Sequence, residues 1–236
     1  MKIGLFSDVH GNAVAFDALL GDLERHPVDR LVCLGDVIQG GPQPVECLDR
    51  LRALDCPVVM GNADWYVLTA DPGVEPETDS QRAVREWAFE QLSDADREFV
   101  RSFSPTVDEP PVLAFHASPT SFEDVILPST PEDEFRRLLG EPDAPILAGG
   151  HTHQQFVRRR AGSLFLNPGS VGLSYDFALI EESTLRFDPW AAYAVVELVD
   201  GRLSVEFRRA PFDPNAVADT IEASDLPDKR RVEGWR

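Results

Sequence analysis

A mixed α/β fold is predicted by the order in which strand-like and helix-like segments follow one another. Two short apolar runs, Lys2 to Phe6 and Arg30 to Leu34, are each followed by a loop containing glycine and then by apolar residues at helical spacing. This alternation is typical of parallel strands joined by helices. In the second half of the chain short strand-like runs dominate, and they end in a hairpin pattern around Asp200 and Gly201. Together these observations indicate an α/β protein with a mixed sheet.

The other elements follow from hydrophobic periodicity and from turn residues. A helix is predicted after each of the first two strands, over Ala13 to Leu23 and over Val45 to Leu54, and a third strand over Pro57 to Met60. The second half contains further predicted strands at Val112 to Phe115, Pro145 to Ala148, Gln154 to Arg159, Ser163 to Leu166, Ala192 to Val199 and Arg202 to Arg209.

A polar, acidic segment from Asp71 to Glu109 interrupts this pattern. It predicts a helical insert beside the loop ends, with helices over Ser80 to Leu92 and Ser93 to Phe103. We expect one domain over residues 1–212, including this insert, and a C-terminal tail over 213–236 in which nothing suggests chemistry. Several aromatic residues would either line a pocket or, as is more common at helical spacing, fill the insert's own core: Trp65, Tyr66, Trp87, Phe89 and Phe99.

Length and composition limit the classes of protein that the chain can form. Its 236 residues are 43% hydrophobic, which is enough for one substantial core. The formal net charge of −19, from 41 acidic and 22 basic residues, repels nucleic acid and anionic membranes, so we expect no stable nucleic-acid binding. No run reaches the roughly 18 apolar residues of a membrane helix, and we expect no leader and a cytoplasmic location. None of these features predicts an oligomeric state.

Polar side chains with metal-binding chemistry follow the ends of the predicted strands, where open α/β sheets place their ligand sites. Four of the five histidines lie in these loops, whereas His26 stands near a helix end. A single histidine would more often be an ordinary polar loop residue, but the conjunction favours a metal site. The candidate ligands are Asp8, His10, Asp36, Asn62, His116, His151 and His153.

The spacing and chemistry of these residues indicate which ions they hold. Residues two apart in an extended segment share a face, so Asp8 and His10 are expected to chelate one ion, and His151 and His153 repeat the spacing. Carboxylate, amide and imidazole donors without thiolate favour manganese, with iron, zinc or nickel as alternatives, over a calcium cage or structural zinc. Two divalent ions about 3.5 to 4 Å apart use such a set better than one ion does.

Read in order from Asp8 to His153, the ligands form the string D-x-H, G-D, G-N, H, G-H-x-H, which resembles the signature of the calcineurin-like metallophosphoesterase superfamily. The segment NPGSVG at 167–172 is further similar to the small prokaryotic phosphodiesterase branch near diadenosine tetraphosphatase-like proteins. The resemblance implies a two-sheet β-sandwich flanked by helices, with a dinuclear metal site along one edge. It also implies that the first ion is held by Asp8, His10, Asp36 and His153, and the second by the bridging Asp36 with Asn62, His116 and His151.

One position departs from the pattern of that family. Many members have a histidine after the asparagine, assigned to protonating the leaving group, whereas this chain has Ala63. Alanine cannot carry a proton, so good leaving groups are expected to be hydrolysed better than poor ones. Two further residues are candidates for substrate contact: Asn12, unless it only forms a turn, and Asp64, unless it only begins a helix.

The function that these features predict is hydrolysis of phosphodiester or phosphoanhydride bonds in small molecules or nucleotides. The resemblance implies that Asp36, Asn62 and His116 act in catalysis together with a metal-bridging hydroxide. A non-catalytic scaffold of the same fold is an alternative, against which the complete ligand set argues. A phosphomonoesterase or protein phosphatase is another, which would resemble relatives that retain the missing histidine. The insert is expected to shape specificity, because the core scaffold supplies all the metal ligands.

Overall fold

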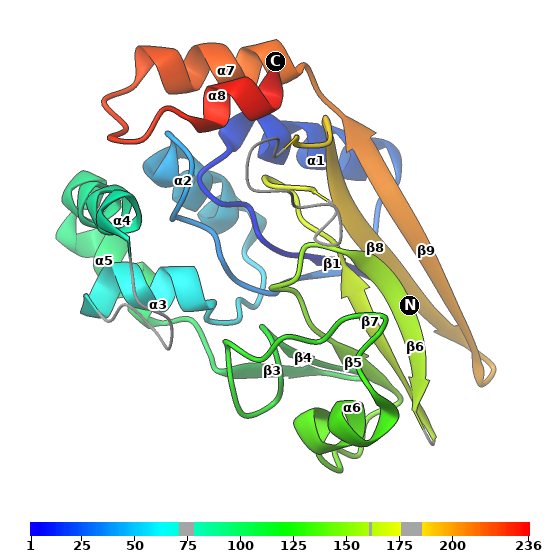
Figure 1. Cartoon of the computed structure of the whole chain (residues 1–236). Coiled ribbons are helices and arrows are strands. Elements are labelled where there is room, and N and C mark those ends of the chain that lie inside the picture. Colours follow the sequence, from blue (N-terminus) through cyan, green and yellow to red (C-terminus); the bar gives the residue numbers. More distant parts are fainter. Residues whose placement is uncertain (71–77, 161, 176–185) are drawn as a thin grey trace.

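Two β-sheets lie face to face at the centre of the molecule, and helices cover their outer surfaces (Figure 1). The computed structural model describes residues 1–70, 78–160, 162–175 and 186–236. Both sheets contain parallel and antiparallel neighbours, which confirms the mixed α/β sandwich expected from the sequence. Among the described residues, no helix is both long and apolar enough to cross a bilayer.

The first sheet has four strands and brings the two halves of the chain together. Strand β1 (Lys2–Phe6) pairs in parallel with β2 (Arg30–Cys33) and antiparallel with β8 (Trp190–Val199), which pairs antiparallel with β9 (Arg202–Pro211). The β8 and β9 hairpin turns at Asp200 and Gly201, both at positive φ, as that dipeptide predicts.

The second sheet has five strands in the order β3-β4-β5-β7-β6. Its centre is formed by three parallel strands, β4 (Val112–Phe115), β5 (Ile146–Ala148) and β7 (Ser163–Pro168). The edges are antiparallel, with β3 (Thr106–Glu109) on one side and β6 (Gln155–Arg160) on the other. Strand β3 falls at the end of the predicted insert, so the last residues of that segment belong to the sheet.

Alternation along the strands gives the sandwich two buried layers. On β1, Ile3 and Leu5 pack toward the second sheet, against residues such as Val112 and Ile146, whereas Phe6 packs toward the helices. Each such aliphatic side chain contributes about 1.5 to 3 kcal/mol when it is fully buried. The layer between the sheets therefore fixes the strand ends from which the candidate ligands project.

Helices cover both outer faces. On the first sheet lie α1 (Ala13–Arg25) and α2 (Pro44–Leu54), close to their predicted positions. On the second sheet lies α6 (Glu132–Leu139), whose Phe135 ring stands 5.7 Å from that of Phe165. Helix α6 has only about two turns, too few for a periodic pattern to be distinguished from a loop.

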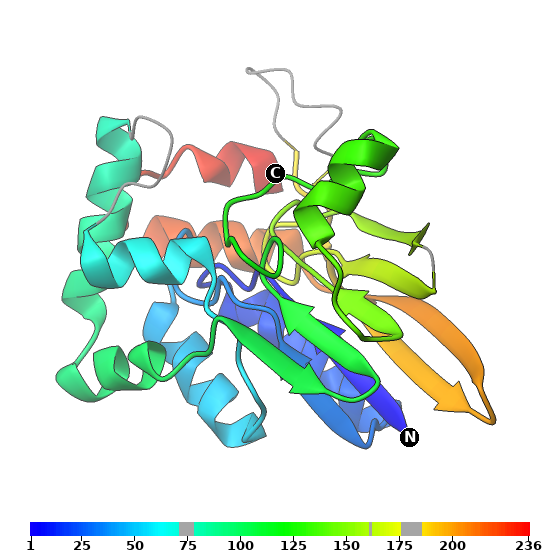
Figure 2. The same ribbon diagram turned by 90° about the horizontal axis from the view of Figure 1, so that it is seen from below.

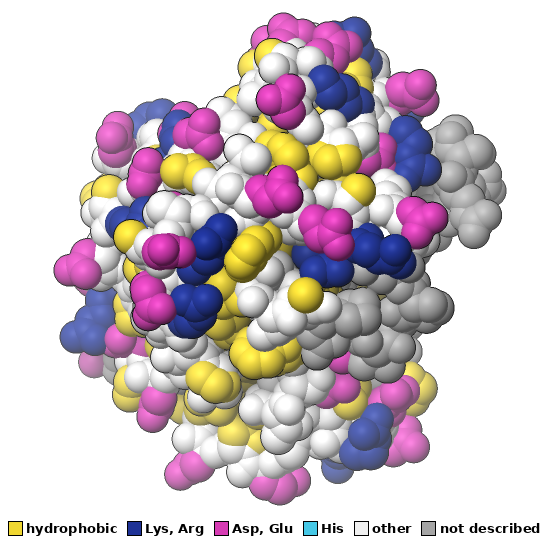
Figure 3. Space-filling model, turned by 90° about the vertical axis from the view of Figure 1, so that its left-hand side faces the viewer, with side chains coloured by type: hydrophobic (Ala, Val, Ile, Leu, Met, Phe, Trp, Pro, Cys, Tyr) yellow, Lys and Arg dark blue, Asp and Glu magenta, His cyan; other side chains and the backbone are white. Residues whose placement is uncertain are grey.

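The predicted insert is a layer of helices at one side of the sheets (Figure 2). Helix α3 (Asn62–Thr69) precedes it, and α4 (Asp79–Gln91) and α5 (Asp94–Arg101) match the two predicted helices. The side chains of Trp87, Phe89 and Phe99 pack against the core shared with α1 and α2, so the described helices of the insert belong to that core. Acidic and basic side chains are interspersed on the face seen from this side (Figure 3).

The predicted strand Pro57 to Met60 is wrong in its extent. Only isolated bridges occur there, from Val58 to Cys33 and from Val59 to Ser104. The segment links β2 to the end of the insert, and because Ser104 supplies only one bridge, no continuous ladder forms. Of the three parallel strands predicted at the start of the chain, the first two form β1 and β2 of the first sheet. The third is a segment with isolated bridges only.

The C-terminal segment is packed against the domain over more of its length than expected. It forms two helices, α7 (Pro214–Ala223) and α8 (Arg231–Trp235), in the segment expected to be a tail. The Trp235 ring is buried, 4.7 Å from the Phe187 ring and 5.6 Å from the Phe212 ring. Residues 213–236 are thus tied to the domain by a small aromatic core.

Candidate metal centre

The seven predicted ligands meet at the edge where both sheets end. Those from the first sheet follow β1 and β2, those from the second follow β4 and β5, and one begins α3. The site thus lies at the carboxyl ends of parallel strands, as expected for an α/β sheet. It contains Asp8, His10, Asp36, Asn62, His116, His151 and His153.

Five of these residues have backbones in the left-handed region. Their φ angles are 59° at Asp8, 49° at His10, 57° at Asp36, 65° at His151 and 60° at His153. A non-glycine residue costs roughly 1 kcal/mol or more in this region, and such strain concentrates at functional sites. The sequence expectation of an extended Asp-x-His pair is therefore wrong.

Hydrogen bonds between neighbouring loops hold this conformation. The backbone N–H groups of Asp8 and His10 donate to the carbonyls of Gly35 and Asp36, both at 2.9 Å. The Asp-x-His pair and the His-x-His pair also differ in whether their two residues belong to the same group of ligands. Asp8 and His10 belong to one group of ligands, whereas His151 and His153 belong to different groups.

Two glycines let the loops approach each other closely. A Cβ atom on Gly61 would lie 2.0 Å from Asp36 Oδ1, and one on Gly150 would lie 2.0 Å from Ser7 Oγ and 2.8 Å from Asp8 Oδ2. Any side chain at these positions would displace a ligand carboxylate or its support. These glycines are required by contact, not by an unusual φ.

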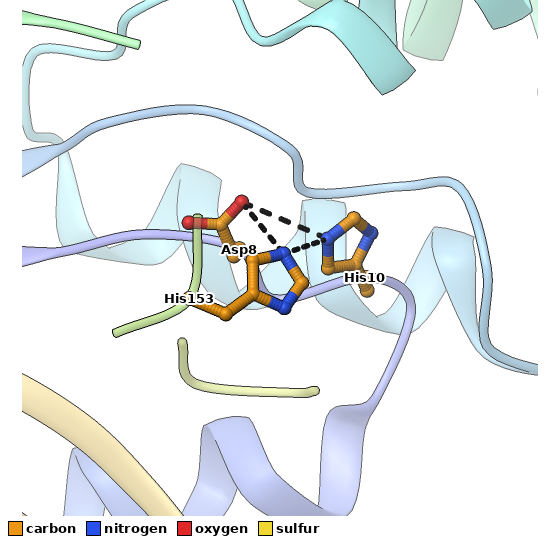
Figure 4. A group of neighbouring side chains, drawn as sticks. All are labelled: Asp8, His10 and His153. Atoms are coloured by element: carbon orange, nitrogen blue, oxygen red, sulfur yellow. Dashed lines mark hydrogen bonds and ion pairs between the residues drawn. The ribbon is translucent and has the colours of Figure 1, made fainter. Parts of the chain in front are cut away.

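Asp8, His10 and His153 form the first group, with ligand atoms within 4.8 Å of one another (Figure 4). His153 Nε2 lies 3.3 Å from Asp8 Oδ1 and 3.1 Å from His10 Nε2. The Nδ1 atoms face backbone carbonyls, at 2.8 Å from Gln39 for His10 and 2.7 Å from Leu173 for His153. A carbonyl can only accept, so each Nδ1 carries the proton and each Nε2 presents a lone pair.

Three electron-pair donors consequently converge on one small space. Asp8 Oδ1 is buried and has no hydrogen-bond partner in the described part of the chain. A carboxylate and two imidazole lone pairs repel one another unless a cation lies between them. Histidine ligands of metals are commonly oriented by a carbonyl at the other ring nitrogen, which is the arrangement seen at His10 and His153. The first group therefore fits a divalent ion.

Asp36, His116 and His151 form the second group, and Asn62 joins them. His116 Nε2 lies 3.4 Å from Asp36 Oδ2 and 2.9 Å from Asn62 Oδ1, and its Nδ1 faces the Leu34 carbonyl at 2.7 Å. His151 Nδ1 is also 2.9 Å from Asn62 Oδ1. The Leu34 carbonyl holds the Nδ1 proton, so His116 Nε2 can offer its electron pair to a divalent ion once the ion displaces the second proton, and these residues also fit such an ion.

The Asp36 carboxylate lies between the two groups. Its Oδ2 is 3.4 Å from His116 Nε2 in the second group and 3.8 Å from His10 Nε2 in the first. Its Oδ1 accepts a hydrogen bond of 2.8 Å from the Ala63 N–H. A carboxylate that contacts both groups fits a bridging ligand.

The electrostatics of the site favour added positive charge. Burial alone would raise the pKa of Asp8 and Asp36, but nearby imidazoles, His153 for Asp8 and His116 for Asp36, hold both below the ordinary value. Burial opposes charge on His116, yet the Asp36 carboxylate raises its pKa to about 9. Burial and His116 lower the pKa of His151 to about 4. The carboxylates thus attract a cation, and a metal ion can replace a proton there.

The NPGSVG segment supports the ligand loops from behind. Asn167 Nδ2 donates to the Gly150 carbonyl at 2.6 Å, next to His151. Ser170 Oγ donates to the Asp8 carbonyl at 2.8 Å. The motif is therefore tied to the site through backbone contacts, and it adds no ligand to either group.

The two expected substrate contacts have side chains bound to the protein's own backbone. Asn12 caps α1 by accepting from the Ala15 N–H at 3.0 Å, and it donates to the Gly172 carbonyl at 3.0 Å. Asp64 is fully buried within α3, and its Oδ1 accepts from two N–H groups in the loop after Asp36, at 2.9 and 3.1 Å. Burial and the Asp36 charge raise the pKa of Asp64 to about 7. These contacts indicate positioning roles.

The residues around position 63 do not supply a proton donor in place of the missing histidine, in the part of the chain that the structure describes. Ala63 is buried, with 7% of its surface exposed. One turn later, Tyr66 lies near Asn62 and donates its hydroxyl hydrogen to Glu123. Burial and Glu123 raise the pKa of Tyr66, so the phenol is a poor acid there. The structure thus places no imidazole at this side of the centre beyond the metal ligands, among the residues that it describes.

A cavity of about 530 Å³ opens beside His153. Its aromatic walls include Tyr175, whose ring lies 4.9 Å from that of His153, and Trp190, over which Arg209 stacks at 4.9 Å. The remaining lining is mostly polar. The sequence does not predict this cavity, because its walls come from segments far apart in the chain: Leu127, Pro128, Ser129, Gln154, Gln155, Ser174 and Asp188.

Known proteins are similar to this chain over nearly their whole length, in sequence or in structure. An uncharacterized protein of Methanocaldococcus jannaschii, MJ0912, is 26% identical over 237 residues, which cover 96% of this chain and 94% of the relative. A metallophosphoesterase from Sphaerobacter thermophilus superposes with a TM-score of 0.79 at 25% identity, covering 100% of both chains. The hypothetical protein PH1004 from Pyrococcus horikoshii OT3 has the same fold, with a TM-score of 0.80 at 19% identity over 99% of this chain and 98% of its own.

The ligand-bearing part of the chain also matches a family model. The model describes the calcineurin-like phosphoesterase superfamily domain and matches residues 1–189, a range that contains every candidate ligand. The sequence resemblance is thereby confirmed at the level of the superfamily. This chain belongs to the calcineurin-like phosphoesterase superfamily and is, by class, a metal-dependent phosphoric-ester hydrolase.

Proposed function

We propose that this protein hydrolyses phosphodiester or phosphoanhydride bonds in small molecules or nucleotides, using two divalent ions held side by side. The observation that carries the proposal is the convergence of imidazole nitrogens and carboxylate oxygens in two neighbouring groups, with Asp36 of the second group lying 3.8 Å from His10 of the first. One ion would be held by Asp8, His10, Asp36 and His153. The other would be held by Asp36, Asn62, His116 and His151.

The residues of the chain then have separable roles. Bound ions lower the pKa of water and neutralise charge that develops on phosphate. Asp36 is expected to set the distance between the ions, and the Ala63 N–H fixes the orientation of its carboxylate. The carbonyls of Gln39, Leu173 and Leu34 hold three imidazoles in the tautomer that leaves Nε2 unprotonated.

The donor set favours manganese, with iron, zinc or nickel as alternatives. Carboxylate and amide oxygens suit manganese, and imidazole accommodates all four metals. Thiolate is missing from both groups, and Cys33 and Cys47, although buried, are not members of either. A soft, thiolate-rich zinc site is therefore not the arrangement present here.

The substrate preference follows from position 63. With Ala63 in place of an acid, and with the Tyr66 phenol bonded to Glu123, proton supply to the leaving group is weak. Activated diesters and phosphoanhydrides have leaving groups that depart without full protonation, so we expect them to be preferred over alkyl monoesters. The cavity beside His153 provides space for the rest of such a substrate.

The net charge and the packing of the helices limit the proposed substrates and the part of the chain that acts on them. The net charge of −19 disfavours polyanionic nucleic acids, so small phosphoesters acted on in the cytoplasm are the proposed substrates. Residues 1–212 form the proposed catalytic domain. Since α4 and α5 share the main core and contact α3, which begins with the ligand Asn62, the proposed influence of residues 71–109 on specificity would act through α3.

The decisive experiment combines metal analysis with hydrolysis. Purified protein would be stripped with chelator, reloaded separately with manganese, zinc, iron or nickel, and assayed on bis(p-nitrophenyl) phosphate, a dinucleoside polyphosphate and glycerol phosphate. We expect close to two ions per chain, and turnover of the first two substrates that vanishes on chelation. His26→Ala serves as a matched control because His26 lies outside both groups. Metal binding without hydrolysis of any ester would support the scaffold alternative instead.

A further inference from the structure

The C-terminal segment brings a basic side chain to the metal centre. Arg231 Nη1 donates to the Gly40 carbonyl at 2.9 Å, across a sequence separation of 191 residues. A Cβ atom on Gly40 would lie 2.8 Å from Arg231 Nη1 and 3.6 Å from His10 Nδ1. The guanidinium and the His10 imidazole therefore flank the same glycine.

Arg231 differs from its neighbours in how its charge is compensated. Arg230 pairs with Asp228 at 2.6 Å, and Arg236 pairs with Glu222 at 2.8 Å. Within the ranges that the structure describes, Arg231 makes no such ion pair and donates to a neutral carbonyl. A guanidinium has five N–H donors, and the contact with Gly40 uses one of them. The side chain is half-buried, and the loss of hydration lowers its pKa.

The position of Arg231 is built into the fold. Helix α8 is anchored by Trp235, which is 4% exposed and packs against Phe187 and Phe212. The Tyr175 phenol lies close enough to influence the Arg231 charge, and its ring contacts His153 at 4.9 Å between centroids. Arg231 is thus held beside His10, with Tyr175 between its surroundings and His153, and it is not a ligand of the first group.

The geometry points to a group next to the reacting phosphate. Arg231 lies on the Nδ1 side of His10, whereas the candidate ion position lies at Nε2. The His10 ring therefore lies between the guanidinium and an ion held at Nε2. A phosphate chain that extends from that ion past the His10 ring would meet the guanidinium, and phosphate is the group that a guanidinium binds best, through two parallel hydrogen bonds.

We propose that Arg231 is a substrate-binding residue that holds the second phosphate group of a phosphoanhydride substrate. The proposal rests on the proposed phosphoesterase function and narrows it, because diesters with a single phosphate cannot use this contact. It also gives the C-terminal segment a role at the site, where sequence analysis expected none.

The test compares inorganic pyrophosphate with inorganic phosphate as ligands of the manganese-loaded protein, measured by calorimetry. Arg231→Gln removes the charge, and Arg230→Gln is the matched control one residue away. We expect Arg231→Gln to weaken pyrophosphate binding roughly 10-fold or more, and phosphate binding far less. Arg230→Gln should leave both affinities near the wild-type values. In hydrolysis, the KM for a dinucleoside polyphosphate should rise more than that for bis(p-nitrophenyl) phosphate.

Equal weakening of both ligands, or no weakening, would overturn the proposal, because a purely structural role through Gly40 does not distinguish one phosphate from two. If Arg231→Gln does not fold or loses its metal, Arg231→Lys supplies the same comparison, with a smaller expected loss for pyrophosphate and again none for phosphate. A different result would contradict the proposed function. If the wild-type protein hydrolyses none of the esters, that function is wrong, whatever the affinity for pyrophosphate.

Discussion

Two buried clusters of charged residues in this protein differ in how their polar atoms are satisfied. The first centres on Asp22, in α1. Its Oδ2 accepts hydrogen bonds from the Tyr193 hydroxyl at 2.7 Å and from Arg208 Nε at 2.9 Å, and its Oδ1 accepts from Arg25 at 3.1 Å. Arg208 also contacts His26 Nδ1 at 2.7 Å. Acceptors and donors are matched there, without any added ion.

The metal centre has the opposite arrangement. Asp8 Oδ1 has no donor among the residues that the structure describes, and the Nε2 atoms of His10 and His153 face each other at 3.1 Å. Buried polar groups are usually paired, so an excess of converging acceptors indicates a cation site, whereas a network in which every acceptor has a donor indicates a structural role. The backbone agrees with this distinction, since left-handed φ angles occur at the ligands and not at Asp22. Satisfaction of polar atoms, more than burial, separates the functional cluster from the structural one.

The largest effect is expected from removing the charge that both ion positions share. Asp36→Asn should lower turnover by more than about 100-fold and should reduce metal content at both positions. Loss of a residue that only supports a metal ligand can already lower activity by up to about 100-fold, and Asp36 is expected to be a ligand itself. Asp22→Asn removes the same charge from the other cluster and should leave metal content unchanged. Metal analysis and turnover of the two variants check this contrast, and near-normal values in Asp36→Asn would contradict the bridging role.

The next effect separates the two groups from each other. His153 belongs with Asp8 and His10, and His151 belongs with Asp36 and His116. His151→Ala and His153→Ala should therefore each lose mainly one ion, and the two variants should differ in the metal concentration that restores activity. Metal titration of each variant measures this. Equal loss of both ions from each variant would leave a single cooperative site as the better description.

A smaller, selective effect is expected at position 63. Ala63→His should help substrates with poor leaving groups by up to roughly 10², because an acid near the centre matters most when the leaving group must be protonated. Since Ala63 is 7% exposed, the new side chain must turn toward the open site to act. The ratio of turnover between nitrophenyl and alkyl esters is the measurement. An unchanged ratio in a metal-loaded variant would show that proton supply does not limit the reaction.

The smallest effect on activity, but a clear one on stability, is expected from Asp22. Burial alone would raise its pKa, but Arg208 and Tyr193 lower it to about 2. A depressed folded-state pKa stabilises the protein above the unfolded value, near pH 4, and this contribution is lost as the pH falls toward 2. Asp22→Asn should cost about 2 kcal/mol at pH 7 and much less near pH 2, as measured by urea unfolding. A pH-independent difference would contradict this electrostatic account.

Much of the fold follows from the sequence because its signals are local. Short apolar strands, the hairpin at Asp200 and Gly201, and the amphipathic helices need only neighbouring residues to be recognised. The strand ends then place the ligand loops at one edge. The exceptions depend on partners far away: the segment at Pro57 to Met60 finds only one bridge to Ser104, and α4 shares a core with distant helices.

In the candidate site, too, some features follow from local sequence and others depend on distant contacts. Residue type and spacing are sufficient to select the seven side chains that the structure brings together. They do not encode the left-handed backbone at Asp8 or His10, which arises from hydrogen bonds to the loop at Gly35 and Asp36. Arg231 carried no signal at all, because its importance depends on how α8 returns to Gly40, 191 residues earlier in the chain.

The origin of the ligands in both sheets has a consequence for the lifetime of the folded state. His10 and His153 are 143 residues apart in sequence, and they meet only when the two sheets have docked. Contacts that form this late are absent from the folding transition state, so they slow unfolding more than they accelerate folding. Bound ions should therefore act mainly on the unfolding rate. The chelated protein would refold at a similar speed but open and expose its chain to proteases more often.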